Sequence, residues 1–312
     1  MRTPRQVRTR IPQHGVAIVL AMGVVALAAL TASALLVSQS TWSRQIELSS
    51  DHVQAQILRQ AGLDWARAVL SDDRRSSTVD HAGEPWSLRL PPIPLENGSL
   101  AGHIEDQQGK FNLNNLLNEG TVNPVQLAHF RRLLTILALP PALADSLVDW
   151  IDTDGEVQSP DGAEDAYYLM RQPPHLSANR PLLDVAELAL VRGFDDNVLA
   201  RLNPFVSALP QFTAVNANTA PPEVISAVVD GLNLEGARAI VAQRERSHFR
   251  DRTDFLAQIP RGLIVAPEDI SLSSNYFVAR MRVTRGGAQV TASALLARAD
   301  AGWPSIVWSH TP

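Results

Sequence analysis

VAIVLAMGVVALAALTASALLV, residues 16–37, is a continuous apolar segment near the beginning of the chain, and no charged residue occurs from Val16 to Ser43. A helix of about 20 apolar residues is long enough to cross the hydrocarbon core of a membrane. Four basic residues precede the segment, and this asymmetry predicts an amino end in the cytoplasm: Arg2, Arg5, Arg8 and Arg10. We therefore expect one retained membrane span. The alternative is a secretory signal peptide, whose apolar region is about 7–15 residues long.

The segment after the span continues as a helix of a different kind. Apolar Ile46, Val53, Ile57 and Ala61 recur at helical spacing, with charged residues between them. This pattern predicts an amphipathic helix that runs to about residue 70 and packs against a globular head.

Short strands and a long helical block make up the rest of the pattern. We expect strands at 86–90, 100–106, 110–114, 277–283, 289–298 and 305–309. We expect helices at 124–137, 142–151, 183–191, 222–229, 235–246 and 253–259. Strands at both ends of a helical block predict an α+β fold. In it, the long amino-terminal helix packs on an antiparallel sheet that carries a large inserted α-helical region.

Composition excludes several classes of protein. The 312 residues contain no cysteine, which excludes disulfides, thiolate zinc sites and a cysteine nucleophile, and the net charge of −5 argues against general nucleic-acid binding. The eight histidines form no helical zinc pair, and no nucleotide-binding or serine-hydrolase motif is present. We therefore do not expect an enzyme.

Carboxylates are concentrated in residues 145–165. This segment has a charge of −8, because it contains eight acidic residues and no lysine or arginine. Clustered carboxylates repel one another unless a cation neutralises them, and oxygen ligands without nitrogen or sulfur favour calcium. The segment does not match an EF-hand loop, because Val157 and Ala163 stand where that loop needs glycine and glutamate. A solvated acidic loop is the alternative.

Residues 215–263 resemble the helix-hairpin-helix modules of DNA receptors. This makes a membrane protein for DNA binding or uptake the alternative function. The charges between Asp230 and Phe255 sum to zero, and Glu235 lies within the hairpin, which is unfavourable for binding phosphates. We expect a helical scaffold for protein contacts and no nucleic-acid partner.

The amino terminus resembles a type IV prepilin-like signal. The leader arginines, Gly15 and the uncharged helix carry this resemblance. It implies that prepilin peptidase cuts after Gly15 and that Val16 becomes the N-methylated first residue. Most members of the family have glutamate at the fifth mature position, whereas this chain has Leu20. A subunit without that glutamate resembles the one placed at the filament tip.

A second resemblance lies in the acidic segment. Asp149-Trp150-Ile151-Asp152-Thr153-Asp154, followed by Gly162-Ala163-Glu164-Asp165 and Tyr168, is similar to the signature of the type II secretion minor pseudopilin K family. KFNLN at 110–114 and VNANTAPPEV at 215–224 are similar to the same family. The family binds calcium near this signature. The ligands implied are Asp152, Asp154, Glu164 and Asp165, followed by Asp149, Glu156 and Asn179.

The resemblance also implies a type IV pilin-like fold, a role, partners and a location. We expect a minor pseudopilin that caps the pseudopilus tip with minor pseudopilins I and J and primes assembly of the major pseudopilin for protein export across the outer membrane. The inner-membrane assembly platform and prepilin peptidase are further partners. We expect a single-pass inner-membrane protein with a periplasmic head. The expected regions are 1–15 (leader), 16–43 (span), 44–114 (amphipathic helix and first strands), 115–265 (helical insertion, with the acidic loop in 115–210 and the hairpin-like part in 211–265) and 266–312 (final strands).

Overall fold

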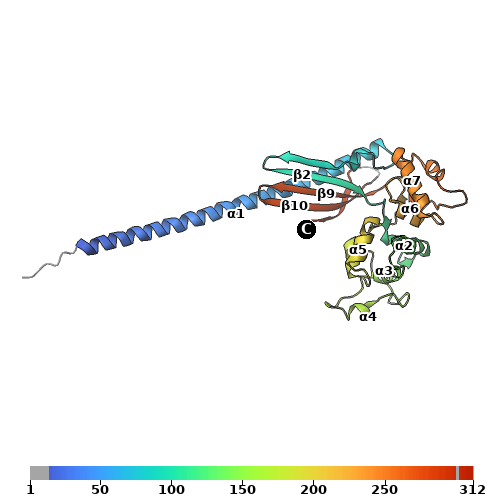
Figure 1. Cartoon of the computed structure of the whole chain (residues 1–312), viewed down its shortest axis with the longest axis horizontal. Helices are drawn as coiled ribbons and strands as arrows, with labels where there is room; N and C mark the ends of the chain where they lie inside the picture. The colour runs from blue at the N-terminus through green and yellow to red at the C-terminus, as the bar shows by residue number, and fades with distance from the viewer. Residues whose placement is uncertain (1–13, 300–301, 312) are drawn as a thin grey trace, which may run out of the picture.

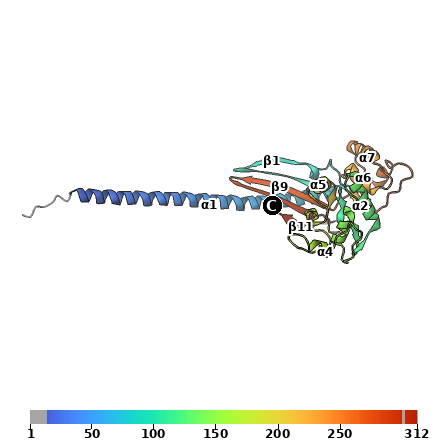
Figure 2. The same ribbon diagram turned by 60° about the horizontal axis from the view of Figure 1, so that its bottom comes forward.

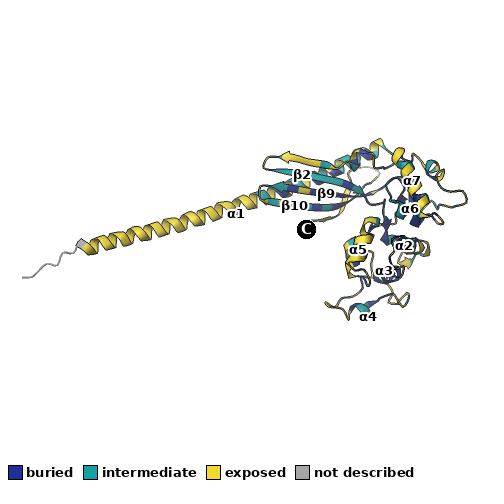
Figure 3. Ribbon diagram, viewed as in Figure 1, coloured by how far each residue is buried: buried dark blue, intermediate teal, exposed yellow. Residues whose placement is uncertain are grey.

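The computed structural model describes residues 14–299 and 302–311, so most of the expected leader lies outside the described residues. A single helix, α1 (His14–Ser76), begins the described chain. Its first half projects from the head as an isolated rod (Figure 1), and its residues are exposed along that length (Figure 3). The helix contains an 18-residue window with a mean hydropathy of 2.4, which is long and apolar enough to cross a membrane. The finding fits the expected membrane anchor.

The second half of α1 packs against a five-stranded antiparallel sheet of order β1-β2-β9-β10-β11. The strands are β1 (Leu90–Leu95), β2 (Gly98–Asp106), β9 (Tyr276–Arg285), β10 (Ala288–Ala297) and β11 (Ser305–His310). Leu63, Ala66 and Leu70 of α1 are buried against Phe277 and Met281 of β9. Gly62 allows this close approach, because a Cβ there would lie 2.5 Å from the sulfur of Met281.

The strands at the two ends of the chain meet in the middle of the sheet. β2 pairs with β9 from Gly98↔Arg285 to Asp106↔Phe277, and β9 pairs with β10 through the tight turn at Gly286. β2 and β9 are neighbours in the sheet, so the segment that connects them in the sequence is an insertion between two paired strands. This arrangement establishes the α+β, pilin-like fold expected from the sequence.

The insertion contains seven α-helices among the described residues. They are α2 (Pro124–Ile136), α3 (Leu143–Ile151), α4 (Asp165–Tyr168), α5 (Asp196–Leu202), α6 (Pro222–Val228), α7 (Leu234–Arg246) and α8 (Arg252–Leu256). The insertion also contains the 3-10 helices η2 (Leu113–Leu116), η3 (Val185–Leu190) and η4 (Asn203–Phe205), whereas η1 (Pro85–Ser87) lies between α1 and β1. Two-residue strands complete the connections: β3 (Phe111–Asn112) with β6 (Val206–Ser207), β4 (Leu117–Asn118) with β5 (Thr121–Val122), and β7 (Val215–Asn216) with β8 (Ile270–Ser271).

The insertion has its own core and lies at the end of the sheet remote from the free half of α1 (Figures 1 and 2). Asn123 caps α2 and Pro124 occupies its first turn, which agrees with the helix expected to begin at residue 124. Phe130, Leu133 and Leu134 of α2 are fully buried in this core, whereas Val125 is exposed. The fold thus places a membrane-type stem and a broad helical region at opposite ends of one molecule.

Buried hydrogen bonds join the insertion to the sheet. The amide of Asn216 donates to Asp106 at 3.1 Å and to Ser274 Oγ at 2.9 Å. The hydroxyl groups of Thr219 and Ser274 also donate to Asp106. Burial raises the pKa of Asp106 to about 6, although these hydrogen bonds act in the opposite direction. The asparagines of the 215–224 segment therefore have a structural role.

Three local predictions were wrong. Residues 86–90 do not form a strand: Trp86 lies in η1, where its ring is buried, and β1 begins only at Leu90. The prolines of β1 fit its edge position because they need not donate to a neighbouring strand. The predicted strand at 110–114 is extended only at Phe111–Asn112, and the predicted helix at 183–191 is the 3-10 helix η3.

Candidate metal centre

The acidic loop connects the end of α3 to α4. Trp150 near the end of α3 packs edge-on against Tyr168 of α4, with ring centroids 4.9 Å apart. This contact brings the two ends of the loop together. Asp152 follows the last residue of α3, and a carboxylate at a helix carboxyl terminus is disfavoured by the helix dipole unless a cation is nearby.

Three carboxylates converge at this point. One oxygen each of Asp152, Asp154 and Glu164 lie within 4.8 Å of one another. Asp152 is 1% exposed and Glu164 is 7% exposed, whereas Asp154 is on the surface. Both carboxylate oxygens of Asp152 and Oε1 of Glu164 are buried without a hydrogen-bond partner. None of the basic residues in the described part of the chain forms an ion pair with these three groups.

The pKa values of the two buried carboxylates, Asp152 and Glu164, are raised by burial, and no positive charge among the described residues offsets this effect. Burial raises the pKa of Asp152 to about 6, with further contributions from Asp154 and Asp149. Burial also raises the pKa of Glu164 to about 7, reinforced by the charges of Asp149 and Asp152. A divalent cation held by the unpartnered oxygens would lower these pKa values, because it favours the ionised carboxylates. Hard oxygen donors without nitrogen or sulfur fit calcium better than zinc or copper.

Asp149 supports the loop from the side of α3. It is fully buried, and its carboxylate accepts a hydrogen bond from the backbone N–H of Gln158 at 3.1 Å. Gly162 packs against it so closely that a Cβ would lie 2.1 Å from Asp149 Oδ2. Burial raises the pKa of Asp149, although backbone hydrogen bonds oppose the change. Its contacts are those of a residue that shapes the loop.

Ser177, for which the sequence carries no signal, connects three of the candidate ligands. Its hydroxyl lies 2.6 Å from Asp165 Oδ1, 3.0 Å from Asn179 Oδ1 and 3.4 Å from Glu164 Oε2. Hydrogen bonds from Ser177 lower the pKa of Asp165. Asp165 and Asn179 thus lie beside Glu164 but are not among the three carboxylates that converge. Glu156 is exposed, and only its backbone N–H contacts the group, through Asp154.

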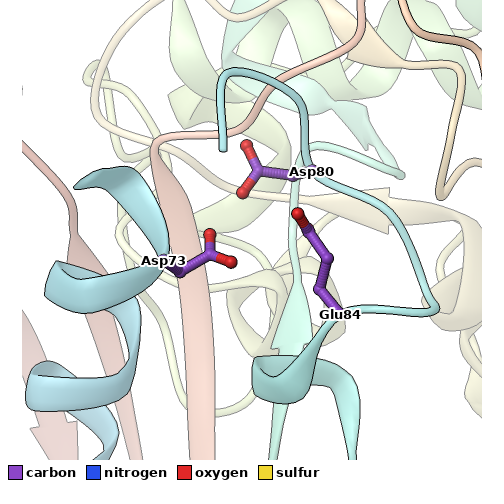
Figure 4. A group of neighbouring side chains, drawn as sticks. All are labelled: Asp73, Asp80 and Glu84. Atoms are coloured by element: carbon purple, nitrogen blue, oxygen red, sulfur yellow. The ribbon is translucent and has the colours of Figure 1, made fainter. Parts of the chain in front are cut away.

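A second group of carboxylates, Asp73, Asp80 and Glu84, lies where α1 ends (Figure 4). This group has an internal cation. Arg298 donates to Asp73 at 2.7 Å and to Asp80 at 2.6 Å, and its side chain is 2% exposed. Glu84 accepts from the indole N–H of Trp86 at 2.8 Å. Burial, with the charges of Glu84 and Asp80, raises the pKa of Asp73 to about 7 despite the opposing effect of Arg298. The group therefore fixes α1 to the end of β10.

The hairpin between α6 and α7 uses its arginines within the protein. Gly231 has a φ of 77° in the turn, as a helical hairpin requires. Arg244 donates to the carbonyl of Ala217 at 2.7 Å, and Arg252 donates to that of Val265 at 2.9 Å. Arg238 pairs with Glu235, so the charge nearest the hairpin is neutralised. These contacts do not favour DNA binding.

The long apolar helix, the antiparallel sheet on its second half and the helical insertion define a pilin-like subunit. Two family models, both described as type II secretion system (T2SS), protein K, match residues 109–211 and 215–270. The chain is 34% identical to type II secretion system protein K of Pseudomonas aeruginosa over 286 residues, which cover 88% of this chain and 85% of that protein. It is 29% identical to the Klebsiella pneumoniae protein of the same name, over 91% of this chain and 92% of that protein.

A solved structure shows the same fold. The chain superimposes with a TM-score of 0.76 and 29% identity on a chain from the crystal structure of the GspK-GspI-GspJ complex of enterotoxigenic Escherichia coli. The match covers 86% of this chain and 99% of that chain. The chain belongs to the type II secretion system protein K family. It is therefore a minor pseudopilin of a protein secretion system, and its family is one of structural subunits.

Proposed function

We propose that this chain caps the tip of the pseudopilus together with minor pseudopilins I and J and primes assembly of the major pseudopilin. The similar solved structure is of a complex that contains GspI and GspJ, which supports these partners. The pseudopilus would then drive protein export across the outer membrane from an inner-membrane assembly platform.

The observation that carries this proposal is the position of the insertion. The free half of α1 leaves the head at one end, and α2–α7 gather at the other end (Figure 1). Subunits of a helical filament pack their long helices side by side, so a further subunit would have to be added beyond the head. The insertion occupies that side of the molecule. A subunit of this shape ends a filament readily but does not continue one.

The amino-terminal residues support a place at the tip and a precursor stage in the membrane. Leu20 is exposed on α1, and it stands where most pilin-like subunits have a glutamate that pairs with a neighbour. Cleavage after Gly15 by prepilin peptidase and N-methylation of Val16 would produce the mature subunit. The exposed apolar surface of α1 suits both lipid and a bundle of similar helices. Before assembly, α1 would anchor the chain in the inner membrane with the head in the periplasm.

Calcium would have a structural role in the acidic loop. Asp152, Asp154 and Glu164 would hold the ion, with Asp165 and Asn179 positioned through Ser177. The ion supplies positive charge to carboxylates that otherwise repel one another. The chain's own contribution is to hold the loop closed through the packing of Trp150 on Tyr168.

Partner binding can be measured with the full chain in detergent micelles, mixed with full-length I and J proteins of the same organism. We expect the three chains to elute together and to be cross-linked as one complex. A mixture of the full chain with an unrelated single-pass membrane protein serves as the control. Failure of the three chains to associate at micromolar concentration would contradict the proposal.

Capping and priming predict separate effects in cells that overproduce the major pseudopilin. Loss of priming lowers the number of pseudopili, and loss of capping increases their length. We therefore expect fewer and longer pseudopili when this chain is deleted, as counted and measured by electron microscopy. Unchanged number and length would contradict both roles.

A further inference from the structure

A cavity of about 240 Å³ lies between the insertion and the face of the sheet that is turned away from α1. Val278, Leu295 and Trp308 line it from the sheet. Ser207 and Asp184 line it from the insertion. Because a water molecule takes up about 30 Å³ of liquid, this space is large enough for a small chemical group and not only for isolated waters.

Two hydrogen-bond donors at this cavity have no partner. Ser207 is 2% exposed, and its hydroxyl is buried without a hydrogen bond. The indole N–H of Trp308 is likewise buried without a hydrogen bond. An unsatisfied buried polar group costs about 1–3 kcal/mol, and native proteins therefore satisfy nearly all of them. An indole N–H can only donate, so its missing partner is an acceptor.

Lys110 adds positive charge at the same place. It is the only lysine in the chain, and its side chain is 14% exposed. Its ammonium group lies 2.8 Å from Glu105 and 3.5 Å from the side-chain oxygen of Gln107. An ammonium group has three donors, so one remains for a further acceptor. Burial raises the pKa of Glu105, but the charges of Lys110 and Arg280 outweigh it and the net pKa is lowered, so this carboxylate stays ionised.

The two carboxylates beside the cavity, Glu105 and Asp184, are already in use. Glu105 is engaged by Lys110 and lies 3.8 Å from Arg280. Asp184 accepts from the backbone N–H of Ala186 at 2.7 Å and lies 3.8 Å from His310. The unpartnered groups are therefore the hydroxyl of Ser207, which can donate or accept, and the indole N–H of Trp308, which can only donate. Two cations face two carboxylates, so the surroundings do not favour an anion of high charge such as phosphate.

We propose that this cavity binds a single carboxylate group, which accepts hydrogen bonds from Ser207 and Trp308 and is attracted by Lys110. The group is carried either by a small free acid or by an acidic side chain of a protein partner, because both present the same chemistry. A carboxylate has two oxygens with about four acceptor sites, which match these donors. The site is independent of the acidic loop and of the proposed role at the tip.

The test uses the full chain labelled with 5-fluorotryptophan in detergent micelles, with the Trp308 signal assigned from the Trp308→Phe variant by fluorine NMR. The probes are propionate and N-acetylglutamic acid α-amide. We expect saturable movement of the Trp308 signal alone among the six tryptophans. The corresponding glutamine amide, which is neutral and of equal shape, should not move it. Stronger binding of the glutamate amide than of propionate indicates a side-chain source, and equal binding indicates a free acid.

The Ser207→Ala variant tests whether the Trp308 signal moves because a carboxylate binds in the cavity or because the added probe changes the solvent. It should weaken binding of the carboxylate probe about tenfold, since a hydrogen bond to a charged acceptor is lost. Ser305→Ala, at an exposed serine of β11, should leave binding unchanged. The proposal is overturned if the Trp308 signal does not move saturably, which would mean a cavity filled by water. It is also overturned if the glutamine amide binds equally well or if Ser207→Ala has no effect.

Discussion

Removal of calcium is expected to destabilise the helical insertion. The carboxylates of Asp152, Asp154 and Glu164 converge, and two of them are buried with unpartnered oxygens. The perturbation is addition of a chelator to the full chain in detergent. The assay is thermal unfolding, followed by circular dichroism, in the presence of free calcium or chelator.

The magnitude follows from linkage between binding and folding. A ligand at 100 times its dissociation constant stabilises the folded state by about 2.7 kcal/mol. For a folded region of about 150–250 residues, each kcal/mol corresponds to about 2–4 °C in melting temperature. We therefore expect the chelator to lower the melting temperature by about 5–10 °C. The insertion should unfold first, because the ion would hold two of its helices together.

Variants identify the ligands. Asp152→Asn removes one of three charged ligands, and we expect affinity to fall by at least about 10–100-fold, as it does for lost metal-supporting groups. At a 100-fold loss, the same calcium concentration stabilises by only about 0.4 kcal/mol. Glu156→Gln is the matched control, because it removes one charge from an exposed position of the same loop. The Glu156→Gln variant should be stabilised by calcium as much as the unaltered chain.

The pH dependence gives an independent check. The folded-state pKa values of Asp152 and Glu164 are raised to about 6 and 7, so the folded calcium-free chain binds protons more tightly than the unfolded chain. In chelator, the stability that these two groups contribute should therefore be complete below their ordinary pKa values of 3.8 and 4.5 and be lost as the pH rises through 6 to 7. Calcium needs ionised ligands, so its effect should grow over the same range. A melting temperature that does not respond to calcium at pH 7.5, with no metal found by elemental analysis, would refute the reasoning.

Three further predictions concern other parts of the chain. Arg298→Met leaves buried carboxylates without their cation and should cost about 3–5 kcal/mol in urea unfolding; a change below about 1 kcal/mol would contradict the assigned role. Gly162→Ala places a Cβ against Asp149 and should cost about 1–3 kcal/mol in the same assay, whereas Gly155→Ala, with no atom within 4 Å of the new Cβ, should change little. Gly15→Ala should leave an unprocessed precursor on gels of whole cells, and normal processing would exclude cleavage after this glycine.

The fold could be predicted where sequence periodicity is strong. The apolar run and the amphipathic pattern after it predict α1, and the alternation in residues 277–283 predicts β9 with its buried face toward that helix. Prediction failed where tertiary packing determines the backbone. Trp86 lies in a 3-10 helix because its ring is buried and Glu84 accepts from its indole N–H, and neither contact is visible in a local pattern.

The candidate site could be predicted in part. The acidic signature predicts Asp152, Asp154 and Glu164, which the structure brings together. Ser177 has no such signal, because a lone serine twelve residues after Asp165 is common in any sequence. The buried Arg298 was missed for a similar reason, since its partners lie more than 200 residues away. Long-range pairs of this kind become visible only in the folded chain.

The central claim is that this chain caps the tip of the pseudopilus. Locating the chain within the filament tests this claim most directly. The chain has no cysteine, so a single cysteine introduced at exposed Ile264 can be labelled with gold without a competing site. Electron microscopy of labelled pseudopili should show gold at one end of each filament. Gold distributed along the filament length would contradict a capping subunit.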